Sequence, residues 1–174
     1  MKRIIALFTV LLLITVALTS CKKAGDAPDG MKLASHEDKA NYFLYVPDDW
    51  TVDLQTGATT VHVSSQDLSN VSVTTWLLEH TDDTVDTWYE SQLDVLNMGF
   101  TDYTEESVRE TTLDGVFAKE YTYTAKLGGN ERKYRQVAAV KSGTVYVISY
   151  STTPELFDEH NSDVDDIITE FRFK

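Results

Sequence analysis

Apolar residues recur at every second position along much of this chain, which is the period of a β-strand. Val61 and Val63, for example, alternate with polar side chains, as in a strand that buries one face. Turn signals such as Asp114-Gly115 separate several of these segments. We therefore predict strands over residues 41–46, 50–54, 59–65, 70–79, 101–113, 116–127, 132–140 and 144–151.

The last of these segments, 144–151, is apolar on both faces. Val145 and Val147 point to one side, and Tyr146, Ile148 and Tyr150 point to the other. A strand of this kind belongs in the centre of a sheet that is covered on both sides. We therefore expect other elements to pack on both faces of the sheet.

Two segments have the helical period instead. In residues 84–98, apolar side chains recur at helical spacing, with Asp82 and Asp83 as expected caps and Gly99 as the end. A second helix is expected to open at Thr153-Pro154, because Thr152 and Glu155 have capping-box spacing. Strands and helices in this order predict an α+β fold, an antiparallel β-sheet sandwiched between helices.

The N-terminus has a different character from the rest. Lys2 and Arg3 precede an uncharged run, residues 4–18, which is short for a membrane span and typical of a secretory signal. The sequence Leu18-Thr19-Ser20-Cys21 follows directly. It resembles the lipobox of bacterial lipoproteins, which implies cleavage after Ser20 and a lipid on Cys21. A plain signal peptide or an uncleaved anchor is the alternative.

These features divide the chain into three parts. We predict a lipoprotein signal peptide over 1–20, a polar flexible tether over 21–39 and one domain over 40–174. A single domain of this size disfavours the two-lobed binding proteins of importers. Cys21 is the only cysteine, so the chain forms no intrachain disulfide.

The formal net charge of the chain is −13, with 28 acidic residues against 15 lysines and arginines. So acidic a surface repels a phosphate backbone, and we expect no nucleic-acid partner. Solubility is the simplest reason for the charge.

Motifs for catalysis or metal binding are absent from the sequence, which has no nucleophile elbow, zinc-protease motif or phosphate-binding glycine loop. We predict no catalytic, cofactor-binding or metal-binding residues and no cofactor. The weighed candidates are expected to be surface or core residues: His36, His62, His80 and His160; the carboxylates Asp163, Asp165 and Asp166; and the pairs Asp48-Asp49 and Glu105-Glu106.

Aromatic side chains are the other candidates for binding. Trp50, Trp76 and Trp88 offer a ligand platform, although at least two of them are expected in the core. Strands rich in tyrosine present an amphipathic contact surface unless helices cover them, and here the tyrosines are Tyr121, Tyr123, Tyr134, Tyr146 and Tyr150.

Several segments together resemble the PsbP-like family. They are YFLYVPDDW near residue 42, the helix DTVDTWYESQL, the hairpin strand VYVISY and the closing IITEFRFK. The resemblance covers the chain from about Asn41 to the C-terminus. It implies an antiparallel sheet between helices and a non-catalytic module, and it carries over no site residue.

Anchor, size and resemblance together predict what this protein does. We expect a non-catalytic lipoprotein, held outside the cytoplasm on the bacterial cell membrane through Cys21, that serves as an accessory or binding module for an envelope protein or complex. A lipoprotein that binds a small ligand or a divalent cation is the alternative.

Overall fold

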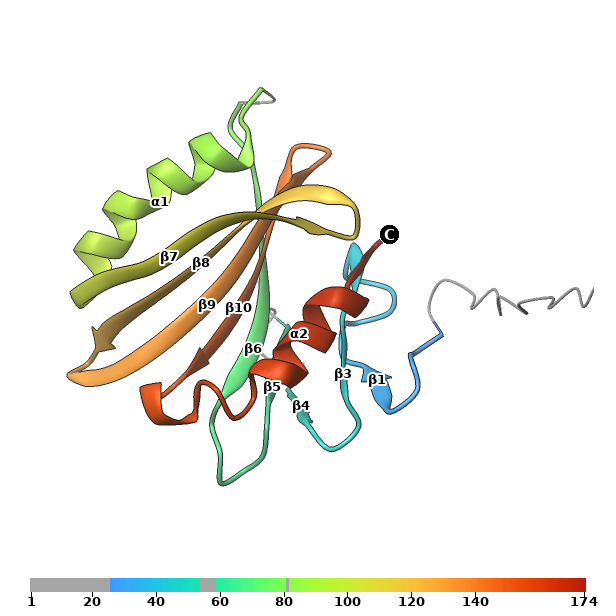
Figure 1. Ribbon diagram of the computed structural model, residues 1–174. Helices are drawn as coiled ribbons and strands as arrows, with labels where there is room; N and C mark the ends of the chain where they lie inside the picture. The colour runs from blue at the N-terminus through green and yellow to red at the C-terminus, as the bar shows by residue number, and fades with distance from the viewer. Residues whose placement is uncertain (1–25, 54–58, 81) are drawn as a thin grey trace, which may run out of the picture.

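The computed structural model describes residues 26–53, 59–80 and 82–174 (Figure 1). Its helices are α1 (Val85–Gly99) and α2 (Asn161–Glu170), with a 3₁₀ turn, η1 (Pro154–Leu156), before α2. Its strands are β1 (Met31–Leu33), β2 (Tyr42–Phe43), β3 (Tyr45–Pro47), β4 (Thr51–Asp53), β5 (Thr59–His62), β6 (Asn70–Leu77), β7 (Thr101–Leu113), β8 (Val116–Leu127), β9 (Asn130–Lys141), β10 (Thr144–Thr152) and β11 (Arg172–Phe173).

The main feature of the fold is a large antiparallel sheet, in the order β4-β5-β6-β10-β9-β8-β7. Two-residue turns join β7 to β8 and β9 to β10, and both residues of each turn have positive φ. Asp114-Gly115 therefore forms the hairpin turn that its sequence predicts. The predicted strands of the sheet are confirmed to within a few residues, and Leu54 of the predicted 50–54 strand lies outside the described residues.

Each face of the sheet carries its own core. Val145 and Val147 of β10 pack with Val85 and Tyr89 of α1 in a cluster that we call the α1-side core. Tyr146, Ile148 and Tyr150 belong to the α2-side core, with Val164 and Ile167 of α2. Figure 1 shows α1 and α2 on opposite sides of β8, β9 and β10. Elements therefore pack on both faces of β10, as the two apolar faces of 144–151 predict.

The α2-side core also takes in the N-terminal part of the described chain. β1 pairs with β3, β11 pairs with β2, and Ala34 is buried. Residues 31–35 therefore pack on the fold, so the stretch predicted as a tether, 21–39, extends too far at its C-terminal end. Its apolar residues are too few to show a period, and their burial comes from pairing with β3.

Both predicted helix starts need correction. The N-cap of α1 is Thr84, which forms a capping box with Thr87, rather than Asp82 or Asp83. The second helix does not run on from Thr153, because η1 ends at Leu156 and α2 begins at Asn161. The hydroxyl of Thr152 hydrogen bonds Ser69 Oγ at 2.6 Å instead of capping a helix.

A buried ion cluster fastens α2 to the sheet. Arg135 of β9 bonds Glu120 of β8 at 3.2 Å and Asp165 of α2 at 2.7 Å, and it donates to Asn161 Oδ1 at 2.8 Å. Only 8% of each side chain is exposed in Arg135 and Glu120. Asp165 is thus an anchoring residue, not the purely solvated carboxylate that the sequence predicts.

In the part of the chain that the structure describes, no helix has the length and apolar content to cross a membrane.

Candidate functional site: a groove beside helix α1

A groove opens on the α1 face of the sheet because the strands change character along their length. The α1-facing residues of β9 and β10 are apolar where the two strands join, as at Ala138 and Val147, and α1 packs there. Toward the other end they are polar, as at Arg132, Gln136 and Ser149. Burying those groups under an apolar helix would cost free energy, and that end of the face stays open.

Helix α1, Phe100 directly after it, and strands β8 and β9 give the groove its aromatic wall. Trp88, Gln92 and Leu96 recur every fourth residue on α1, so one stripe of the helix faces the groove. Tyr123 and Tyr134 stack with ring centroids 4.8 Å apart, and Phe100 lies 5.4 Å from Tyr134. The groove has a volume of about 660 Å³, which is typical of a small-molecule site.

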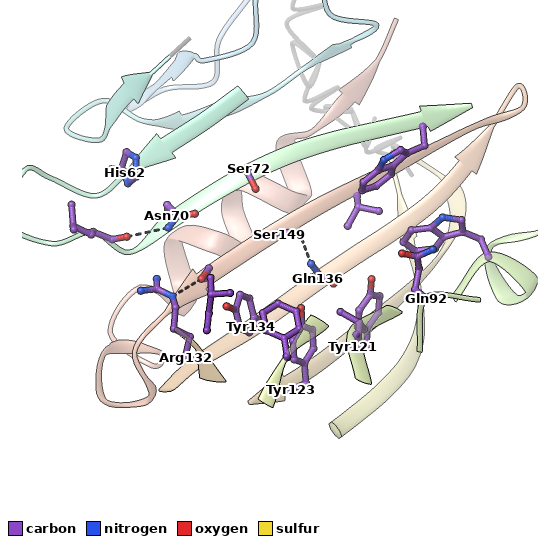
Figure 2. Close-up of a pocket in the computed structure, with 18 residues that line it drawn as sticks. His62, Asn70, Ser72, Gln92, Tyr121, Tyr123, Arg132, Tyr134, Gln136 and Ser149 are labelled. Atoms are coloured by element: carbon purple, nitrogen blue, oxygen red, sulfur yellow. Dashed lines mark hydrogen bonds between the residues drawn. The ribbon is translucent and has the colours of Figure 1, made fainter. Parts of the chain in front are cut away.

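The polar end of the groove is held by short hydrogen bonds. Gln136 Nε2 donates to Ser149 Oγ at 2.7 Å, and Arg132 Nε donates to Ser151 Oγ at 2.9 Å. Figure 2 shows Arg132, Tyr134, Tyr123 and Tyr121 in a row along one wall. The strands thus present fixed donors beside aromatic rings.

Several donors in the groove have no partner among the residues that the structure describes. They are the two terminal nitrogens of Arg132 and the hydroxyls of Tyr121 and Tyr123. The Nδ1 atom of His62 is buried and also without a partner there. Burial raises the pKa of Tyr121 and of Tyr123 above that of free tyrosine. Both phenols therefore stay neutral hydrogen-bond donors at physiological pH.

The aromatic candidates from the sequence divide between the two faces. Tyr121, Tyr123 and Tyr134 line the groove, whereas Tyr146 and Tyr150 lie in the α2-side core. At least two tryptophans were expected in the core, but only Trp50 is fully buried there, and Trp88 packs partly against the α1-side core. Trp76 is 48% exposed and lines the groove 6.0 Å from Trp88, centroid to centroid. Two of the three tryptophans thus contribute to a surface that a ligand can reach.

The four histidines are not brought together. His36 and His80 are exposed, His62 lines the groove and His160 is buried beside α2. Over residues 26–53, 59–80 and 82–174, no three side chains of His, Cys, Asp or Glu are placed to hold a metal ion. The pairs Asp48-Asp49 and Glu105-Glu106 are exposed. Of these, Glu105 accepts from the Tyr89 hydroxyl and Glu106 pairs with Lys133 at 2.7 Å.

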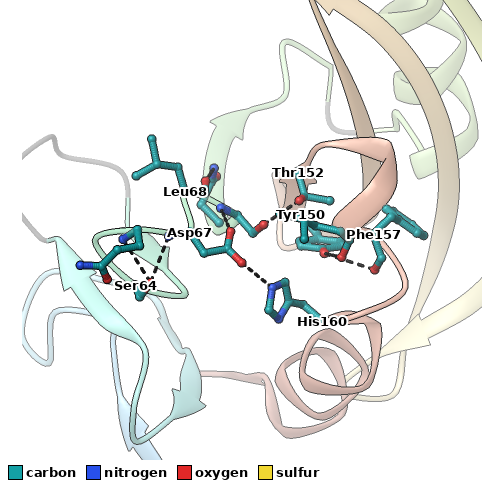
Figure 3. Close-up of polar contacts among 11 residues, drawn as sticks. Ser64, Asp67, Leu68, Tyr150, Thr152, Phe157 and His160 are labelled. Carbon is teal, nitrogen blue, oxygen red and sulfur yellow. Dashed lines mark hydrogen bonds and ion pairs between the residues drawn. The ribbon is translucent and has the colours of Figure 1, made fainter.

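His160 belongs to a second polar cluster, which joins the β5–β6 connection to the start of α2 (Figure 3). Its Nε2 lies 2.7 Å from Asp67 Oδ2, and the backbone N–H of Ser69 donates to Asp67 Oδ1 at 2.8 Å. Ser64 Oγ accepts from the backbone N–H of Asp67 at 3.0 Å. Burial by itself would raise the pKa of Asp67, but hydrogen bonds from Ser69 and His160 outweigh it, and the pKa is lowered.

This shift predicts the effect of pH on an Asp67→Asn variant. A carboxylate whose folded pKa lies below its unfolded value, near 3.9, stabilises the fold above that pH and loses this effect as pH falls through the folded pKa. We expect the variant to lose about 1–2 kcal/mol near pH 7, and this deficit to disappear at acid pH values below the folded pKa of Asp67. Urea unfolding between these pH values measures the difference, and Asp166→Asn on the exposed side of α2 is the control. A deficit that stays constant with pH would contradict the assignment.

The groove could be found only in part from the sequence. The stripe of Trp88, Gln92 and Leu96 and the alternation in 132–140 are visible there, but they do not show which polar residues α1 leaves uncovered. The predicted lipid site, Cys21, and its lipobox residues Leu18, Thr19 and Ser20 lie outside the described residues.

Solved structures share this fold. Cyanobacterial PsbP (CyanoP) from Synechocystis sp. PCC 6803 is 20% identical, with a TM-score of 0.61 over 90% of this chain and 99% of that chain. LpqN of Mycobacterium tuberculosis, described as involved in cell envelope biogenesis, is 15% identical, with a TM-score of 0.60 over 83% of this chain and 90% of that chain. PA94 from Pseudomonas aeruginosa, a protein of unknown function and putative regulator, is 17% identical, with a TM-score of 0.56 over 80% and 94%.

No curated protein matches this chain. The family model described as "PsbP-like protein" matches residues 29–173, which include every strand and helix of the described fold. This protein therefore belongs to the PsbP-like family.

Proposed function

We propose that this protein is a non-catalytic accessory module, anchored by a lipid on Cys21 to the outer face of a bacterial cytoplasmic membrane, which binds another protein or complex of the cell envelope. The observation that carries the proposal is the combination of a PsbP-like domain over 29–173 with a lipobox-like Leu18-Thr19-Ser20-Cys21 ahead of it. The envelope role in the description of LpqN supports it. In this proposal the domain is the PsbP-like sandwich, with the large sheet between α1 and α2.

Lipid attachment explains how such a domain stays at the membrane. Each buried CH₂ group contributes about 0.8 kcal/mol, so one acyl chain binds weakly and two or more bind stably. Residues from 22 to about 30 then form the tether. The acidic surface repels anionic head groups and holds the domain away from the bilayer.

The anchor is tested by replacing its cysteine. In cells fed an alkyne-tagged fatty acid, we expect the wild type to carry the label and to remain in the membrane fraction. Cys21→Ala should carry no label, because the acceptor thiol is gone, and should be released or mislocalised. Ser20→Ala, which keeps a small residue before the cysteine, is the matched control. Equal membrane retention of Cys21→Ala would instead identify residues 4–18 as a true span.

The accessory role is tested by crosslinking the anchored protein in living cells and identifying what co-purifies. We expect one envelope protein to be enriched with the wild type and not with Cys21→Ala, and to capture this protein in the reciprocal experiment. Turnover of a substrate that disappears after a single change in the groove would overturn the non-catalytic assignment.

Binding of a small ligand is the second candidate function. The groove beside α1 favours it, because its volume, its aromatic wall and its unpartnered donors suit a small molecule. A binder of this kind would deliver or sense its ligand at the membrane. For a divalent cation, the described ranges contain no cluster of three side chains placed to bind the ion.

A further inference from the structure

The charges that line the groove differ from those of the rest of the molecule. The chain carries 28 aspartates and glutamates, yet none is among the described residues that line the groove. Arg132 is the permanent cation in that set, and the remaining polar residues are neutral or, in His62, basic. A positive site inside a strongly acidic protein favours an anionic group at that place.

Arg132 is oriented for such a group. Its Nε is bonded to Ser151 Oγ at 2.9 Å, which fixes the plane of the guanidinium. Its two terminal nitrogens have no acceptor among the described residues, so their N–H groups remain for a ligand. A planar guanidinium donates two parallel hydrogen bonds to a carboxylate, and this pairing is both strong and specific.

The remainder of the groove suits an apolar body next to that carboxylate. Trp88, Leu96 and Phe100 of the α1 side face the stacked rings of Tyr123 and Tyr134. The hydroxyls of Tyr121 and Tyr123 are neutral donors without protein partners there. Figure 2 shows Tyr134, Tyr123 and Tyr121 following Arg132 along the same wall.

The number of charges limits the ligand further. One arginine balances one negative charge, and a net charge of −13 repels a second or third. We propose that the groove beside α1 binds a small monocarboxylate with an apolar body, whose carboxylate pairs with Arg132. This inference does not depend on the envelope partner proposed above.

The test compares three probes of the same shape on the full chain in nanodiscs of a neutral lipid. The probes are phenylbutyrate, phenylbutanol and phenylbutylamine, and empty nanodiscs correct for partition into lipid. Trp76 and Trp88 line the groove, so tryptophan fluorescence and calorimetry report binding. We expect phenylbutyrate to bind about tenfold more tightly than phenylbutanol, because a charge-assisted pair replaces a neutral hydrogen bond. Phenylbutylamine should bind weakest.

Matched variants on adjacent positions of β9 assign the preference to Arg132. Arg132→Gln should remove the preference for the carboxylate and leave the affinity for phenylbutanol unchanged. Arg132→Lys, which keeps the charge without the fork, should retain part of the preference. Lys133→Gln removes a cation that faces the opposite side of the sheet, where it pairs with Glu106, and should keep all of it.

Three results would overturn the inference. One is an absence of saturable binding of phenylbutyrate, and another is equal affinity for phenylbutyrate and phenylbutanol. Both are measured with the wild-type protein, so neither depends on whether a variant folds. The third is an Arg132→Gln variant that keeps the preference.

Discussion

The free energy of unfolding of an Arg135→Met variant is expected to be about 3–5 kcal/mol lower than that of the wild type. The methionine fills much of the space but leaves Glu120 buried with its Arg135 partner gone. Arg109 still bonds Glu120 Oε1 at 2.7 Å, but its side chain is 62% exposed and screened by water. The loss therefore comes from a buried carboxylate left with one partner that water screens, together with the lost links from β9 to Asn161 and Asp165 of α2.

Two further variants separate this cause from a simple packing defect. Arg109→Met removes only the exposed partner of Glu120 and is expected to cost about 1 kcal/mol or less. The double variant Arg135→Met/Glu120→Leu removes both buried charges and should recover much of the stability, since a well-packed apolar pair replaces them. Urea unfolding followed by circular dichroism gives all three values. A double variant less stable than Arg135→Met alone would mean that the buried charge is not the cause.

Trp50→Ala is expected to destabilise the fold by a similar amount, about 3–5 kcal/mol. The Trp50 side chain is 2% exposed, packs in the α2-side core and lies edge-on to His160 with ring centroids 6.3 Å apart. Truncation leaves a cavity between the β3–β4 turn and the start of α2. The rigid sheet does not collapse to fill it, so both burial and dispersion contacts are lost.

Trp76→Ala is the matched control, because it removes the same side chain from β6 at a position that is 48% exposed. We expect it to cost about 1 kcal/mol or less. Thermal and urea unfolding of the two variants give the comparison. Equal losses for Trp50→Ala and Trp76→Ala would show that Trp76 supports the fold and not only the groove.

The periodicity of single segments was sufficient for much of this fold. The two apolar faces of 144–151, the helix after Thr84 and the turn at Asp114-Gly115 depend on residues that are close in the chain. Alternation of side chains across a strand and φ preferences at turns are local properties, so the sequence carries them directly. Segments that resemble the PsbP-like family also predicted the family, and the family model confirms it.

The helix starts and the buried charges could not be predicted from local sequence, because they depend on contacts between residues that are distant in the chain. Thr152 has the spacing of a cap, yet Ser69, 83 residues away, takes its hydroxyl. Asp165 looks like one more solvated carboxylate of α2 until β9 places Arg135 beneath it. The local sequence gives each of these groups one role, a cap for Thr152 and a solvated carboxylate for Asp165. The tertiary fold brings a distant partner that binds the group instead.

The sequence by itself determined the strands, the two-sided cover of the central strand and the family of this protein, and it predicted the lipid anchor on Cys21. Only the tertiary structure decided that α1 covers the apolar ends of β9 and β10 and leaves Arg132, Gln136 and Ser149 open. Where a helix lies on a sheet depends on the summed burial of side chains from several strands. No single segment contains that sum, and the groove therefore emerged only with the fold.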